Sequence, residues 1–541
     1  MYDFLIQNVS IIDGTGTPAY QGNVAIKDGK IALEPAEPVA GEVIDGEGLS
    51  LCPGFIDSHS HGDLILGQEA ARLCKVSQGV TTEIAGQCGD TMFPVSEQPE
   101  RREMLAQLVG SFTEQLPQEL PQFTTMERYL GYVSTLPLSC NVKLYVGHAS
   151  LRIAAMGFED RVPTPGELNH MKAMLREAME QGALGMSSGL LYSPSGYADE
   201  DELVGLCKVV AEYDGVYASH IRNEAAGVVE SVKEAIAVAE RAGCRLCISH
   251  HKICGKENWG RSVETLRLIH EAIDRGARIT FDVYPYTASM SNLNVCLPPA
   301  FFSNGPEKMG ELLKLPEIRS QLQAEMERMD GRYRHCGGFD RILVALAPNT
   351  PACRGLTVAE YANRIGKDPF DAYFDILVEN GHSALAIYFS MDEEELQRIM
   401  ADENAVVGSD GIVLNLTGPT HPRGFGSFTK AIRYFVKEKK LFTLEEMIHK
   451  MTQLPAERFM ISNKGVIADG YDADLVLFKR DEIRDCATYQ DSNVLSEGIE
   501  MVFINGQLVY KDKKLTGAAP GRFIPHLTVL PASQYNKIQS C

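Results

Sequence analysis

Short apolar runs separated by turn residues occupy both ends of the chain and predict β-strands there. Near the start, Asp28-Gly29 follows an apolar run and favours a hairpin turn. Near the end, residues 501–510 have the pattern of two strands around Asn505-Gly506, which suits a type I′ turn. Two β-rich ends around a different middle predict one small β-sandwich domain, built from residues 1–52 together with the end segment, residues 461–541.

The middle of the chain, residues 53–460, alternates apolar strand-like runs with helical periodicity. Helical patterns such as residues 165–181 and 223–242 are followed by glycine, as helix C-termini commonly are. The eight candidate strands end near His61, Cys88, His148, Ser188, His220, His250, Tyr284 and Asp410. Eight alternating strand–helix units predict an α/β fold with a closed (β/α)8 barrel of the TIM type, in which chemistry occurs at the C-terminal strand ends.

The segment between the seventh and eighth candidate strands is too long for one strand–helix unit. We therefore expect an insertion at about residues 287–337, beside the mouth of the barrel. Long insertions at that face often carry function, so a lid over the pocket is the favoured interpretation.

The composition is that of a globular protein, with 541 residues, 44% hydrophobic and 23% charged. A net charge of −21 argues against nucleic acid or an anionic membrane as partner and leaves a small-molecule substrate. The 13 cysteines have no disulfide-scaffold spacing, which indicates a reducing compartment. With neither a signal-peptide pattern at the start nor a membrane-length apolar run, the sequence predicts a cytoplasmic protein.

His59 and His61 follow the first predicted barrel strand with one residue between them. Residues two apart on a strand point to the same face, so the two imidazoles can hold one metal ion. The alternative is a pair of surface histidines at a strand end.

His220 and His250 end two successive apolar strands, and Cys88 ends the second strand. One such histidine would more often be a hydrogen-bonded core residue, and a single cysteine is more often structural. Two histidines at successive strand ends, after a His-x-His pair, favour metal binding, and a thiolate is a good zinc ligand.

Asp410 follows the last strand, where a carboxylate beside a metal can accept a proton from water and return it to a leaving amine. Taken alone, the motif around Asp410 supports an alternative about equally well, in which this aspartate caps the next structural element. Cys244 and Cys247 have C-x-x-C spacing but lie inside a strand, so core packing is favoured over redox or zinc chemistry.

Taken together, the sequence resembles the D-aminoacylase (N-acyl-D-amino-acid deacylase) family of the amidohydrolase superfamily. The resemblance runs over nearly the whole chain, and its cysteine, S-H-x-R-N-E and S-H-H-K segments are far more specific than the His-x-His pair. The matching segments are residues 54–61, 86–89, 219–224, 249–252, 408–411 and 421–423.

The resemblance implies a barrel with a β-sandwich made by both termini. It implies a tight zinc site at Cys88, His220 and His250, and a second, weaker metal position at His59 and His61. Asp410 matches the catalytic aspartate. Many related enzymes bridge two metals with a carboxylated lysine on the fourth strand, but residues 183–188 contain no lysine, so Cys88 fits as the bridging ligand.

The resemblance also places four substrate contacts, each of which would otherwise be interpreted as an ordinary charge or packed ring. Lys252, Tyr284 and Arg423 match positions that hold the substrate α-carboxylate, and their chemistry suits an anion. Tyr192 matches a tyrosine near the scissile carbonyl. The insertion has no basic residue before Lys308, which predicts a neutral or apolar substrate side chain.

The sequence therefore predicts zinc-dependent hydrolysis of an N-acyl-D-amino acid to a carboxylate and a free D-amino acid. A cyclic amidase of the hydantoinase or dihydroorotase kind is the alternative enzyme, against which the missing lysine argues. A non-catalytic scaffold is the third possibility, although such proteins usually lose metal ligands and this chain retains the whole set.

Overall fold

Eight parallel strands form the centre of the structure, a computed structural model that describes residues 1–33, 39–110, 113, 116–298, 301, 306–412 and 420–526. Two sheets contribute them, β6-β7-β8 and β9-β10-β11-β12-β13-β17. The strands are β6 (Phe55–Asp57), β7 (Val80–Ala85), β8 (Asn141–Leu144) continued by β9 (Val146–Gly147), β10 (Gly185–Gly189), β11 (Val216–His220), β12 (Arg245–Ile248), β13 (Ile279–Val283) and β17 (Ala405–Val407). These are the eight strands that the sequence predicts, and the predicted barrel class is confirmed.

The barrel closes where its first and last strands meet. Ser60 and Gly411 form a parallel bridge, and the Ser58 N–H donates to the Val407 carbonyl at 3.3 Å. The Asp410 N–H donates to the His59 carbonyl at 2.8 Å. Residues from the start and the end of the barrel are thereby placed side by side.

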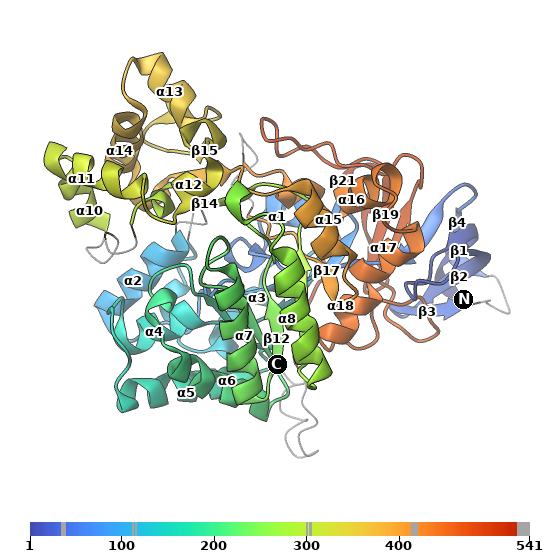
Figure 1. Ribbon diagram of the computed structural model, residues 1–541. Helices are drawn as coiled ribbons and strands as arrows, with labels where there is room; N and C mark the ends of the chain where they lie inside the picture. Colours follow the sequence, from blue (N-terminus) through green and yellow to red (C-terminus); the bar gives the residue numbers. More distant parts are fainter. Residues whose placement is uncertain are drawn as a thin grey trace.

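Helices follow the barrel strands and cover the outside of the barrel (Figure 1). They include α5 (Pro165–Glu180), α6 (Glu200–Glu212), α7 (Val228–Ala242) and α8 (Ser262–Asp274). Helix α7 begins five residues later than the predicted start at Asn223, because the Asn223 side chain accepts the N–H groups of Ala225 and Gly227 at 2.8 and 3.2 Å. This local turn competes with helix formation and leaves Glu224 at the mouth of the barrel.

Strands from both ends of the chain hydrogen-bond into one nine-stranded sheet. Their apolar faces enclose a core of their own, to which Ile6, Val24, Leu475 and Phe503 contribute. The strands are β1 (Tyr2–Ile11), β2 (Tyr20–Lys27), β3 (Lys30–Leu33), β4 (Ala40–Asp45), β5 (Ser50–Pro53), β18 (Leu475–Phe478), β19 (Ile499–Ile504), β20 (Gln507–Lys511) and β21 (Lys514–Leu515). Figure 1 shows this sheet beside the barrel, with the first strands in blue and the last in red.

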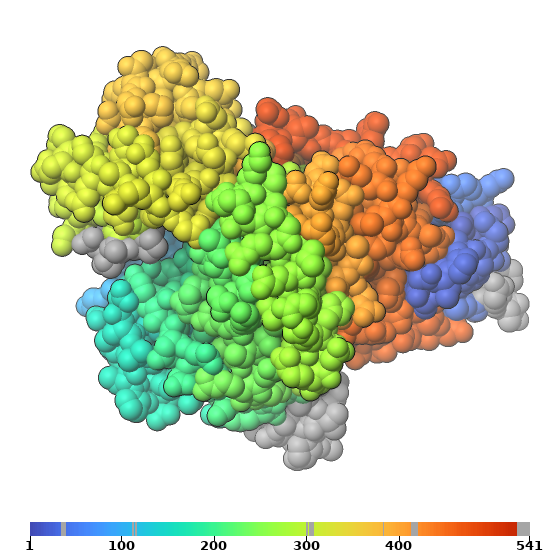
Figure 2. Space-filling view, viewed as in Figure 1, coloured from blue at the N-terminus to red at the C-terminus, as the bar shows by residue number. Residues whose placement is uncertain are grey.

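A further unit with its own apolar core is inserted between β13 and β17 and lies against the barrel (Figures 1 and 2, yellow). It runs from Ser289 to Tyr388, further than the predicted insertion at residues 287–337. Its antiparallel strands are β14 (Ser289–Asn292), β15 (Ile342–Leu346) and β16 (Leu385–Tyr388). Its α-helices are α10 (Pro306–Leu312), α11 (Pro316–Met326), α12 (Arg332–Cys336), α13 (Val358–Ile365) and α14 (Pro369–Asn380). None of the helices in the described part of the chain has the length and apolarity needed to cross a membrane.

A buried lysine stabilises the junction of the first and last barrel strands. Lys75, on α1 (Glu69–Val76), places its Nζ 2.5 Å from Asp57 Oδ2 and 3.4 Å from Glu83 Oε2. Asp57 in turn accepts the Ser409 N–H at 2.8 Å and the Ser409 hydroxyl at 2.6 Å. Burial alone would lower the pKa of Lys75, but the two carboxylates outweigh it and raise the pKa above its usual range.

We expect Lys75→Met to destabilise the fold by about 3–5 kcal/mol, because it leaves Asp57 and Glu83 as buried carboxylates without a cation. The measurement is the urea midpoint of unfolding. The control is Lys208→Met on the exposed face of α6, which should change the free energy of unfolding by less than about 0.5 kcal/mol. Equal midpoints for the two variants would contradict the role of Lys75.

Candidate metal centre and active site

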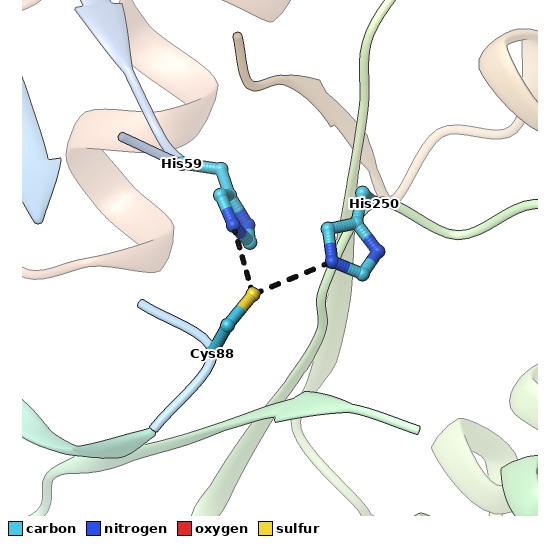
Figure 3. A group of neighbouring side chains, drawn as sticks. All are labelled: His59, Cys88 and His250. Carbon is cyan, nitrogen blue, oxygen red and sulfur yellow. Dashed lines mark hydrogen bonds between the residues drawn. The ribbon is translucent and has the colours of Figure 1, made fainter. Parts of the chain in front are cut away.

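Three of the five predicted metal-binding residues surround the sulfur atom of a fourth, Cys88, at the C-terminal ends of the barrel strands. Cys88 Sγ lies 3.5 Å from His59 Nε2, 3.5 Å from His250 Nε2 and 3.6 Å from His220 Nδ1. Figure 3 shows His59 and His250 facing the sulfur from two sides. All four side chains are buried. The fifth residue, His61, lies beside His59, with the two ring centroids 5.6 Å apart.

Carboxylates hold the far nitrogens of two of these histidines. Asp282 Oδ2 lies 3.1 Å from His59 Nδ1, and Asp282 Oδ1 accepts the His250 backbone N–H at 2.9 Å. Glu224 Oε1 lies 3.3 Å from His250 Nδ1, which Lys252 Nζ approaches to 2.7 Å. A carboxylate on one imidazole nitrogen orients the ring and leaves the other nitrogen to a metal. Both rings therefore present Nε2 toward Cys88.

Three residues of this centre adopt a left-handed backbone that side chains other than glycine rarely take. The φ angles are +56° at Cys88, +36° at His250 and +49° at Asp410. Such conformations cost roughly 1–3 kcal/mol each and persist where the surrounding structure imposes them, often at functional sites. All three lie two or three residues beyond the end of a barrel strand, and their side chains line the same cavity.

The chemistry of the donors fits a bound zinc ion. His220 Nε2 is buried without a hydrogen-bond partner among the described residues, although Glu224 Oε1 lies 3.5 Å away. Burial raises the pKa of the Cys88 thiol well above its usual range, so a thiolate at this position requires a cation. Imidazole nitrogens with a thiolate are the ligand types that zinc prefers.

Potential ligand atoms form overlapping groups whose members all lie within 4.8 Å of one another. One group is His59, Cys88 and His250, and a second is His59, His61 and Asp410. A third joins His220 and His250 to Glu224. Because His59 and His250 each belong to two groups, the cluster has room for adjacent metal positions that share ligands.

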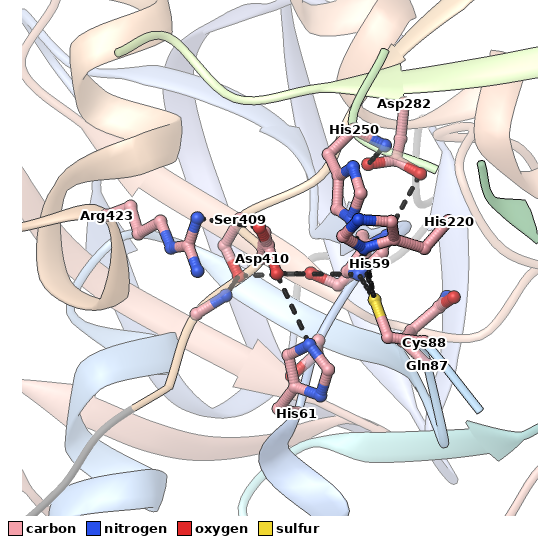
Figure 4. A network of polar contacts seen from close by, with 12 residues as sticks. His59, His61, Gln87, Cys88, His220, His250, Asp282, Ser409, Asp410 and Arg423 are labelled. Atoms are coloured by element: carbon pink, nitrogen blue, oxygen red, sulfur yellow. Dashed lines mark hydrogen bonds and ion pairs between the residues drawn. The ribbon is translucent and has the colours of Figure 1, made fainter. Parts of the chain in front are cut away.

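Asp410 lies between the histidines and a buried guanidinium (Figure 4). Its Oδ1 is 3.3 Å from His61 Nε2 and 3.6 Å from His59 Nε2, and its Oδ2 is 2.6 Å from an Arg423 nitrogen. Burial alone would raise the pKa of Asp410, but Arg423 and the histidines outweigh it and hold the pKa well below its usual range. The carboxylate is thus charged and can accept a proton.

The predicted substrate-contact residues Lys252, Tyr192 and Arg423 line the same cavity, and Tyr284 borders it. Arg423 and Lys252 both face the ring of Tyr284, at 5.0 and 5.7 Å from its centre. The Tyr192 ring lies 4.9 Å from the His220 ring, on the other side of the cluster. Lys252 and Arg423, with Tyr284 between their contacts, therefore form a positively charged part of the cavity, the cationic pole. The potential metal ligands line the same cavity.

Known proteins share this architecture. A family model described as the amidohydrolase family matches residues 42–311 and 350–510. The chain belongs to the amidohydrolase family. Within it, the chain is 34% identical to an N-acyl-D-aspartate deacylase and 35% identical to an N-acyl-D-glutamate deacylase, both from Alcaligenes xylosoxydans xylosoxydans. These matches cover 99% and 96% of this chain and 97% and 96% of the relatives.

A solved amidohydrolase structure has the same fold over nearly its whole length. It is the N-acyl-D-glutamate deacylase of Bordetella bronchiseptica, complexed with zinc and a phosphonate inhibitor that mimics the tetrahedral intermediate. The TM-score is 0.81 at 34% identity, with 97% of this chain and 99% of that chain covered. The resemblance to the D-aminoacylase branch is thereby confirmed, and the protein is a metal-dependent amidohydrolase.

Sequence reasoning assigned no role to three residues of this amidohydrolase site. Asp282 is the lone acid in the apolar strand β13, and a buried charge in such a strand is the signal that could have identified it. Glu224 belongs to a segment that supports the resemblance, but its contact with His250 depends on the late start of α7. Arg332, from α12 of the insertion, also lines the cavity, and no local pattern marks it.

We expect Cys88→Ala to lower the affinity for zinc by at least roughly 100-fold, since even the loss of a residue that only supports a ligand costs 10- to 100-fold. Zinc retained after dialysis against a graded chelator measures the change. Cys353→Ala is the matched control, because Cys353 is also buried but lies in the core of the insertion, where its thiol donates to the Thr350 carbonyl. Unchanged zinc retention in Cys88→Ala would exclude Cys88 as a ligand.

Proposed function

We propose that this amidohydrolase hydrolyses the amide bond of N-acyl-D-amino acids and releases a carboxylate and a free D-amino acid. The observation that carries the proposal is the position of Asp410, between the histidine–cysteine cluster and the cationic pole. The activities named for the relatives with 34% and 35% identity support the same substrate class.

The cationic pole suits the α-carboxylate of such a substrate. Arg423 is almost fully buried, and its Nε has no hydrogen-bond partner among the described residues. Lys252 lies near the same tyrosine ring. A guanidinium and an ammonium held over one ring can fix a carboxylate by charge-assisted hydrogen bonds, while the phenol of Tyr284 adds a neutral donor. The bound carboxylate then positions the neighbouring amide toward Asp410.

Asp410 transfers the proton that the reaction requires. As a water oxygen forms a bond to the acyl carbon, Asp410 accepts a water proton, and it then delivers this proton to the amide nitrogen as the carbon–nitrogen bond breaks. The products are the acyl carboxylate and the D-amino acid, so one water is consumed. A zinc ion held by the cluster would polarise the acyl carbonyl and lower the pKa of the water. Tyr192, next to His220, is the proposed donor to the carbonyl oxygen.

For the metal we propose one tight position at Cys88, His220 and His250, and a second, weaker position at His59 and His61 with Cys88 as the bridge. The close approach of Cys88 Sγ to His59, His220 and His250 supports its role as a ligand shared by the two positions. A cyclic amidase with a lysine bridge is disfavoured, because the strand that would carry the lysine, β10, contains only Gly, Met and Ser.

A screen of N-acetyl-D- and N-acetyl-L-amino acids against the zinc-loaded enzyme tests the proposed reaction, with release of the free amino acid as readout. We expect turnover of D-substrates and little turnover of the L-enantiomers. Ring opening of a hydantoin without release of amino acid from any N-acetyl-D-amino acid would show that the proposal is wrong.

We expect Asp410→Asn to retain zinc and to lower kcat by at least about 1,000-fold, within the range that positioned acid–base groups contribute. Zinc content and kcat are measured on the same preparation, so that loss of metal is separated from loss of the proton carrier. Asp481→Asn, at an exposed aspartate far along the chain, is the control and should behave as wild type. Near-normal turnover in Asp410→Asn would remove Asp410 from the mechanism.

A further inference from the structure

An arginine from the insertion projects into the catalytic cavity of the barrel. Arg332 opens the short helix α12, yet its side chain lines the same cavity as His220, Lys252 and Asp410. It is 8% exposed. A guanidinium taken out of water in this way needs acceptors, because burial of an unsatisfied charge is costly.

The acceptors that surround Arg332 are weak or already engaged. The nearest carboxylate oxygen is Glu224 Oε2 at 3.6 Å, beyond hydrogen-bonding range, and Glu224 is in direct contact with Lys252. In the described part of the chain, the hydrogen-bond acceptor of Arg332 is Cys254 Sγ at 3.8 Å. The Tyr388 ring lies 5.4 Å from the guanidinium carbon. Arg332 therefore has N–H groups available for an oxygen ligand in the cavity.

Two serines of the insertion line the cavity with Arg332. Ser289 and Ser291 alternate along β14 and so point to the same face. Ser289 is 7% exposed, and its buried Oγ has no hydrogen-bond partner among the described residues. Ser291 Oγ donates to the Tyr192 hydroxyl at 3.2 Å. A buried unpaired hydroxyl and a guanidinium in the lining of one cavity indicate a polar ligand there.

We propose that Arg332 and Ser289 bind a carboxylate in the side chain of the substrate, so that the enzyme prefers N-acyl derivatives of acidic D-amino acids. The proposal rests on the function proposed above and specifies its substrate. The α-carboxylate occupies the pole formed by Lys252, Tyr284 and Arg423, which leaves Arg332 for the second anion. This inference opposes the neutral or apolar side chain that the sequence predicts.

Physical reasons favour an anion over the alternatives at this position. An apolar side chain would leave the Ser289 hydroxyl without a partner and would leave Arg332 only its long contacts with Glu224 and Cys254, which is unfavourable for both groups. A neutral amide offers one carbonyl oxygen but also an NH₂ group that cannot pair with a guanidinium. A carboxylate offers two acceptor oxygens in the geometry that a guanidinium matches, with the opposite charge.

The experiment compares kcat/KM for N-acetyl-D-glutamate, its neutral isostere N-acetyl-D-glutamine, and N-acetyl-D-methionine, with N-acetyl-D-aspartate as the shorter acid. We expect the wild-type enzyme to prefer glutamate over glutamine by about 100-fold, as for a buried charge pair. Arg332→Met should abolish most of this preference. Its kcat/KM for N-acetyl-D-methionine should stay within about threefold of the wild-type value. Ser289→Ala should lower kcat/KM by roughly fivefold for the acidic substrates and leave it unchanged for the others.

Arg334→Met is the matched control, because Arg334 lies on the same short helix but is exposed. It should keep the glutamate-to-glutamine ratio of the wild type. Arg332→Lys keeps the charge and should retain part of the preference, which separates loss of the cation from loss of packing. If Arg332→Met lowered kcat/KM equally for all substrates, the role of Arg332 would be only structural and the inference would be wrong.

Binding to the zinc-loaded Asp410→Asn variant, measured by calorimetry, separates this inference from the proposed reaction. Tighter binding of N-acetyl-D-glutamate than of N-acetyl-D-glutamine supports the anion site even if turnover is absent. Equal binding of the two compounds, or wild-type turnover of N-acetyl-D-methionine that matches that of N-acetyl-D-glutamate, would overturn the inference while leaving amide hydrolysis intact.

Discussion

The junction between the first and last barrel strands is the contact on which the catalytic centre depends. Asp57, at the end of β6, accepts two hydrogen bonds from Ser409, and Lys75 neutralises the buried carboxylate. The backbone of Asp410 is bonded to the carbonyl of His59 across the same junction. Residues some 350 positions apart are thereby held so that Asp410 lies beside the two histidines of the His-x-His pair. A parallel barrel can create this contact only by closing on itself.

Buried charge organises the rest of the cavity. Carboxylates hold the far nitrogens of His59 and His250, so that the near nitrogens converge on the Cys88 sulfur. Left-handed backbone at Cys88, His250 and Asp410 directs these side chains inward from rigid strands. A constellation of imidazoles, a thiol and carboxylates in so little space is unfavourable without a cation, and a metal ion such as zinc would relieve the unfavourable electrostatics and supply Lewis-acid chemistry.

The two sides of the cavity have different origins. The barrel supplies the potential ligands, Asp410, and the cationic pole at Tyr284, whereas the insertion supplies Arg332 and Ser289. This division is physically sensible, since the reacting amide is common to all substrates of the proposed class and only the side chain varies. An inserted unit with its own core can present different side chains to the cavity without disturbing the strands that hold the reactive groups.

Much of this protein is determined by local sequence. Short apolar runs, helical stretches ending in glycine and polar residues at strand ends are local patterns, and they suffice to predict the barrel and the grouping of Cys88 with the histidines. The late start of α7, which places Glu224, and the extent of the insertion to Tyr388 are not visible in such patterns. Arg332 is hidden for the same reason, because it lies 40 positions after the end of β14 and reaches the cavity only through the packing of α12. Strand-end residues are brought together by a general property of parallel barrels, whereas a contact made by an inserted helix depends on how that particular unit packs, and only the tertiary structure decides it.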